Sequence, residues 1–60
     1  KQMKVGDLVR LKKHCRNGGM YALVIGVYPI AADIQYLDAS TGHKVAYALK
    51  SNLELISEGG

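Results

Sequence analysis

The sequence predicts an all-β domain folded as a small five-stranded barrel. Five short runs are either wholly apolar or alternate between apolar and polar residues, and turn-forming residues separate them. No stretch carries the 3.6-residue apolar period of an amphipathic helix. The run YALVIGVY at residues 21–28 is apolar on both faces, so we expect closure of the sheet to cover it on both sides.

The length of 60 residues predicts a single domain spanning 1–60. A chain of this size buries only about 60% of the surface that its unfolded form exposes. The one cysteine, Cys15, allows no intrachain disulfide, and no set of four Cys and His residues is present to hold a structural zinc. We therefore expect tight packing, self-association, or both to supply the missing stability.

The first strand is expected at residues 7–13, where Val9 and Leu11 alternate with basic residues and face inward. A long loop should follow at residues 14–19, because Asn17-Gly18 is a strong turn signal and a second glycine lengthens it.

The central strand lies in the run 21–28, and we assign one of its faces to the core. That face comprises Leu23, Ile25 and Val27. The other face carries Ala22, Val24 and Gly26. Gly26 predicts a bulge or bend that lets the strand curl, and Pro29 ends the strand because it cannot donate to a sheet ladder.

Three further strands and a turn between the last two complete the predicted sheet. The third strand spans 33–38 with Ile34 and Tyr36 on one face, and the fourth spans 43–49 with a turn before it. Ser51 and Asn52 indicate a turn or a single helical turn, a short last strand covers 53–56, and residues 57–60 should fray.

The segments VGDLVRL, LVIGV and NLELI, in this order, resemble an SH3-like barrel over residues 4–57. The resemblance implies a single 3-10 turn at residues 50–53, before the last strand. The opening GDLVR also resembles KOW-type barrels of ribosomal and transcription-elongation proteins, in which Gly26 would correspond to the glycine of the second strand. The layout is similar to short barrel proteins of tailed phages and mobile elements. The loop HCRNGGMY departs from the KOW motif, since it lacks the basic-glycine run that leads into the strand.

The formal charge of +3 is concentrated in the first 16 residues, which hold six of the eight basic residues and one acidic residue. Such asymmetry indicates an anionic partner, and it gives the alternative function of RNA or DNA binding. The residues assigned to that alternative are Arg10, Lys12, Lys13 and Arg16. A solvated face that also protects a sheet edge explains the same pattern.

The four tyrosines divide into two groups. Tyr36 and Tyr47 share the phase of core positions, so we expect them to be structural. Tyr21 and Tyr28 flank the central run and, together with Val24, are the predicted contacts with a protein partner.

The chain offers no pattern typical of an enzyme, so none of its residues is assigned to catalysis, a metal or a cofactor. His14 and Cys15 point to opposite sides of an extended backbone, and His43 is distant in sequence. No apolar run approaches the ~20 residues of a membrane helix, and the single thiol favours the cytoplasm. The sequence thus predicts a non-enzymatic interaction or assembly module that associates with itself or with another protein.

Overall fold

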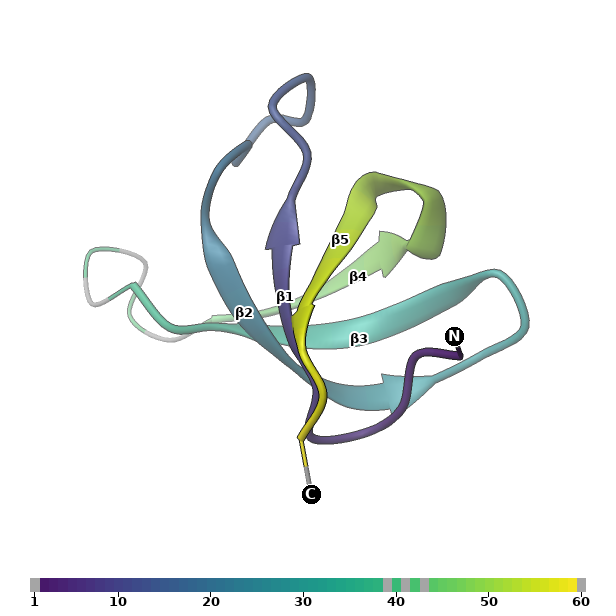
Figure 1. The fold of residues 1–60 in the computed structure, drawn as a ribbon. Coiled ribbons are helices and arrows are strands. Elements are labelled where there is room, and N and C mark those ends of the chain that lie inside the picture. The colour runs from purple at the N-terminus through teal and green to yellow at the C-terminus, as the bar shows by residue number, and fades with distance from the viewer. Residues whose placement is uncertain (1, 39, 41, 43, 60) are drawn as a thin grey trace.

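The structure, a computed structural model, describes residues 2–38, 40, 42 and 44–59. Its five strands form one antiparallel sheet in the order β4-β3-β2-β1-β5, and the 3-10 turn η2 joins the two edge strands (Figure 1). The described residues contain no α-helix. The elements are β1 Leu8–Leu11, β2 Tyr21–Val27, β3 Ala31–Tyr36, β4 Val45–Leu49, η2 Lys50–Asn52 and β5 Leu53–Ser57. The all-β class, the five strands and the 3-10 turn are confirmed.

The sheet curls strongly because two of its strand pairs contain an irregularity. Between β2 and β3 the register shifts from Val24 to Gly26, which leaves Ile25 as an extra residue. A second shift lies between Leu8 and Val9, where β1 pairs with β5. Such bulges bend a strand and increase its twist, so the bend predicted at Gly26 is confirmed. β4 and β5 are the two edges of the sheet, and the described pairings do not join them into the closed ring that the sequence pattern predicts.

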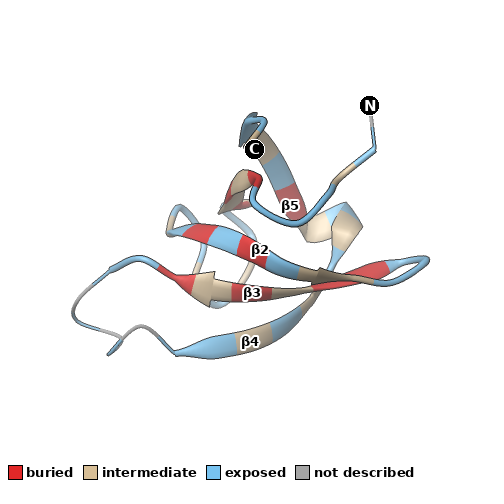
Figure 2. Cartoon of the chain, turned by 90° about the horizontal axis from the view of Figure 1, so that it is seen from below, coloured by how far each residue is buried: buried red, intermediate tan, exposed pale blue. Residues whose placement is uncertain are grey.

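The core lies on the inner side of the curled sheet and is formed by buried residues of β1, β2, β3 and β5. Figure 2 marks buried positions along the strands in red. Val9 and Leu11 of β1 are buried, as predicted. The other members of the core are Ala22, Val24, Ala32, Ile34, Tyr36 and Leu53. β1 is shorter than predicted because the chain turns away at Lys12 into the loop, whose Gly19 has a φ of 89°.

The prediction for the two faces of β2 is wrong for residues 22–25, whose sides are exchanged. Val27, which follows the bulge at Ile25, packs against the core as predicted. Ala22 is fully buried and Val24 is 1% exposed, whereas Leu23 is 36% and Ile25 44% exposed. The register supplies the reason: Ala22 lies directly between Val9 of β1 and Tyr36 of β3. The inner side of the curl has room for alanine and valine at these positions, and the larger residues take the outer side.

β3 starts two residues earlier than predicted and buries Ile34 and Tyr36, as predicted. The assignment of Tyr47 to a structural role on the core side is wrong, since this residue of β4 is 67% exposed. The inner positions of β4 are instead occupied by Ala46 and Ala48, which pack against the core. Residue 43, predicted to open this strand, lies outside the described residues.

The segment after β5 is docked onto the N-terminal part of the chain. Asp7 is fully buried, and its carboxylate accepts hydrogen bonds from the backbone N–H of Lys4 (2.9 Å) and of Gly59 (3.0 Å). A side chain at position 59 would collide with the carbonyl oxygen of Gly6, so this close approach requires glycine. The frayed end expected from residue 57 onward is therefore not observed at residues 57–59.

Candidate interaction surface

The outer side of the sheet carries a row of three apolar residues and one glutamine that crosses four strands. In the register, Val45 of β4 faces Gln35 of β3, Gln35 faces Leu23 of β2, and Leu23 faces Leu8 of β1. Val45 is 59% exposed, and Leu23 is among the large hydrophobic residues left exposed. Further exposed apolar residues lie on the same two strands or beside them: Tyr21, Ile25, Tyr28, Tyr47 and Leu49. We call Leu23, Ile25, Val45, Tyr47 and Leu49 the outer apolar surface.

A small aromatic group borders this surface. The rings of Tyr28 and Tyr47 lie with centroids 6.0 Å apart and planes tilted by 43°. The hydroxyl of Tyr28 donates a hydrogen bond of 2.8 Å to Oδ2 of Asp33, the residue that faces Tyr47 across β3 and β4. Because this bond stabilises the protonated phenol beside a carboxylate, it raises the pKa of Tyr28 above 10.0. Tyr28 is thus held in one orientation while its ring remains exposed.

The three residues predicted to contact a partner differ in their exposure to solvent. Tyr21 and Tyr28 are exposed, as expected of contact residues. Val24 is buried between β1 and β3, so it cannot contact a partner, and its place on the surface is taken by its neighbours Leu23 and Ile25. The sequence prediction missed these two residues and the β4 residues, although the alternation of Val45, Tyr47 and Leu49 with alanines contained the signal.

The four predicted basic residues do not form a single patch. Arg10 lies on β1, where its Nη2 is 3.2 Å from Oε1 of Glu54 and its guanidinium is 5.8 Å from the ring centroid of Tyr21. The hydrogen bonds that Nε and Nη2 donate to Glu54 raise the pKa of Arg10. Lys12 is half-buried, and Lys13 and Arg16 are exposed in the loop between β1 and β2.

Arg16 lies near Lys44, a basic residue that was not predicted to belong to any site. An open hollow of about 320 Å³ is lined by Arg16, Asn17, Tyr36 and Lys44. The amide of Asn17 donates a hydrogen bond of 3.2 Å to the hydroxyl of Tyr36, which fixes the loop against the end of β3. The hollow therefore brings two cationic side chains and polar groups together from segments that are far apart in the sequence.

His14 and Cys15 hold the same loop against η2. Nε2 of His14 lies 3.1 Å from Oδ1 of Asn52, and the thiol of Cys15 contacts the carbonyl oxygen of Asn52 at 3.9 Å. Cys15 is half-buried and packs against the core. In the part of the chain that the structure describes, no three His, Cys, Asp or Glu residues are placed to hold a metal ion.

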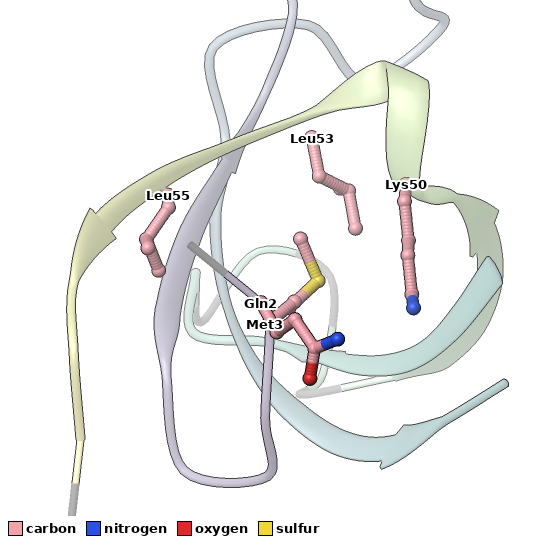
Figure 3. A pocket seen from close by; sticks show the side chains of 5 residues that line it. All are labelled: Gln2, Met3, Lys50, Leu53 and Leu55. Carbon is pink, nitrogen blue, oxygen red and sulfur yellow. The ribbon is translucent and has the colours of Figure 1, made fainter. Parts of the chain in front are cut away.

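A second hollow, of about 380 Å³, lies where the N-terminal segment passes over the curled sheet. Its lining residues are Gln2, Met3, Lys50, Leu53 and Leu55. Figure 3 shows Met3 pointing toward Leu53, with Lys50 alongside. Met3 packs against the core, so this segment covers the inner side of the sheet next to β5.

Comparisons with known proteins add no relative: no family model, no curated protein and no solved structure matches the chain. Among the residues described, no helix is long and apolar enough to cross a membrane. The proposed function therefore rests on the surfaces described above.

Proposed function

We propose that this chain is a non-enzymatic interaction or assembly module whose contact is made by the outer apolar surface. The observation that carries the proposal is the exposure of large apolar side chains on β2 and β4, while the smaller residues of the same two strands, Ala22, Val24, Ala46 and Ala48, face the core. Asp33 and Gln35 of β3 lie between the two apolar groups. Large apolar side chains exposed on one side of a small domain are typical of a protein–protein contact. Covering it would also add the apolar burial that a 60-residue chain lacks.

The fold supports the resemblance on which part of this proposal rests. Five antiparallel strands with a 3-10 turn between the last two are the arrangement that an SH3-like barrel implies. We extend the proposal to membership of that group of barrels, including the short barrel proteins of phages and mobile elements. The free thiol of Cys15 fits a cytoplasmic location.

Sedimentation velocity over a concentration series, from about 10 μM to about 1 mM, tests the proposed function. We expect the mass to rise above the 6.5 kDa of the single chain, and Tyr47→Ser to reduce the rise because it removes apolar area from the contact. A monomer at all concentrations, with a cooperative thermal transition, contradicts the proposal.

The hollow lined by Arg16 and Lys44 favours a second candidate function, the binding of RNA or DNA. Two cations beside an amide and a hydroxyl suit a backbone phosphate, and Lys12 and Lys13 lie on the same loop. Labelled RNA and DNA should bind more weakly as salt increases, and Arg16→Gln with Lys44→Gln should flatten that dependence. Absence of binding at low salt excludes this function.

A further inference from the structure

β4 is an edge strand whose outward backbone groups can be identified from its pairing. The N–H of Tyr36 donates to the carbonyl of Lys44, and the N–H of Lys50 donates to the carbonyl of Ile30, both at 2.9 Å. In an antiparallel pair the bonded residues alternate, so the even-numbered residues of β4 bond to β3. The N–H and C=O groups of the odd-numbered residues, Val45, Tyr47 and Leu49, point away from the sheet.

The five residues of this edge strand lack the features that normally protect one, although a lysine flanks the strand at each end. Charged residues, proline and bulges discourage pairing with another chain, and the segment VAYAL contains no charge and no proline. Its register with β3 is also regular. The opposite edge, β5, carries Glu54 and pairs irregularly with β1, so the two edges are not equivalent.

We propose that β4 pairs with β4 of a second copy of this chain, antiparallel and about a two-fold axis at Tyr47, to form one sheet that continues through both copies. This inference rests on the proposed function as an assembly module, and it names the partner and the contact. The strand is self-complementary because VAYAL has the same pattern in both directions: a branched apolar residue, alanine, tyrosine, alanine, and a branched apolar residue. A two-fold contact requires such a surface.

The pairing register follows from the outward groups. Tyr47 faces Tyr47 of the second copy, and Val45 faces Leu49 of the second copy. Each of these is a hydrogen-bonded pair that exchanges both of its bonds, so the outward groups of all three residues are satisfied. Their side chains, which lie on the outer side of the sheet, then form apolar cross-strand pairs.

Charge sets the strength of the contact. In the same register Lys44 faces Lys50 of the second copy, and like charges opposite each other weaken pairing. Added salt screens this repulsion, so the self-association should strengthen with salt, in contrast to binding of nucleic acid. A five-residue edge buries less than the about 800 Å² per partner of a standard interface, so the dimer should be weak and should depend on concentration.

Disulfide trapping tests the register. In a Cys15→Ser background, Tyr47→Cys places two thiols across the axis with Cα atoms about 5.5 Å apart, which a disulfide can span. Val45→Cys is the matched control, since its thiols lie about four residues, or about 14 Å, apart along the strands. We expect Tyr47→Cys to cross-link at least about tenfold faster than Val45→Cys, and equal rates would overturn the register.

Leu49 permits a second test that alters the backbone without straining the single chain. Its φ of −67° is already the value that proline requires, and its N–H points to the open edge. Leu49→Pro should weaken the dimer at least about tenfold, because it removes a donor on each side of the axis. Leu49→Ala, which keeps the N–H, should weaken it less.

Amide exchange of the unaltered protein supplies a readout that needs no variant. On raising the concentration from about 20 μM to about 1 mM, the amides of Val45, Tyr47 and Leu49 should gain protection. Self-association with unchanged exchange at these amides, or with Leu49→Pro equal to the unaltered protein, overturns the β4 pairing and leaves the proposed function standing. A mass above that of a dimer overturns the two-fold arrangement, and a strict monomer overturns both proposals.

Discussion

On β2 and β4 both sides of the sheet carry apolar residues, but those that face the core are smaller than those on the outer side. Inside, Ala22 and Val24 are buried, and Ala46 and Ala48 pack against the core. Outside, Leu23 and Tyr47 are left in contact with solvent. The larger side chains of the concave side come from the other strands, among them Ile34 and Tyr36 of β3, so the space that remains opposite β2 and β4 decides which of their faces becomes the core.

The largest effect should come from removing a branched side chain on the inner side. Ile34 is fully buried, so Ile34→Ala creates a cavity and should lower the free energy of unfolding by about 2–5 kcal/mol. Val45→Ala, a change on the outer side where the residue is 59% exposed, should cost only about 0.5 kcal/mol at a concentration where the chain is monomeric. Urea unfolding measures both, and equal losses would contradict the distinction between the two sides.

Enlarging a residue on the inner side tests the limited space directly. Ala22 lies between Val9 and Tyr36, so Ala22→Leu should force these side chains apart and lower the free energy of unfolding by about 1–3 kcal/mol. If the larger residue instead stabilises the protein in urea unfolding, space does not determine the choice of face.

Asp7 is the one charged residue among the buried residues of the described chain, and it gives the fold a dependence on pH. Its hydrogen bonds from the backbone of Gly59 and Lys4 lower its pKa below the ordinary 3.8. A lowered pKa contributes stability that is present above the unfolded value and is lost as the pH falls through the folded value.

Asp7→Asn should therefore lower the thermal midpoint at neutral pH, because the two hydrogen bonds go to different carboxylate oxygens and the amide nitrogen that replaces one of them cannot accept. The midpoints of the two proteins should converge as the pH falls below about 4. A constant difference between them over this range would show that the carboxylate charge contributes nothing.

The smallest effect concerns Tyr28, on the outer side. Asp33→Asn removes the carboxylate that holds its hydroxyl, so the pKa of Tyr28 should fall toward 10.0. The raised pKa contributes stability below pH 10.0 that is lost as the pH rises through the folded value. The absorbance of tyrosinate follows the titration of all four tyrosines. The part of the signal that is lost in Tyr28→Phe belongs to Tyr28. An unchanged titration would mean that the Tyr28 to Asp33 bond is absent in solution.

The sequence was sufficient for the strands and their order along the chain, because turn residues and period-two patterns are local signals. It predicted the inward positions of β1 and β3, where polar residues occupy the opposite face. It failed on β2, since both faces of that strand are apolar and periodicity cannot decide between Leu23 and Val24. The hollow lined by Arg16 and Lys44 could not be predicted either, because it forms only where segments that are distant in the sequence meet in the folded chain.

The docking of Gly59 onto Asp7 has a consequence for how the chain opens. The hydrogen bond joins residues separated by 52 positions, so nearly the whole domain lies within one loop that this tie closes. Breaking this hydrogen bond would release two segments together: the N-terminal segment, which lines the hollow of about 380 Å³, and the residues that follow β5. The N-terminal segment and the end of β5 should therefore become susceptible to proteases together. Replacing Gly59 by any residue with a side chain should increase this susceptibility, because the side chain would collide with the backbone of Gly6.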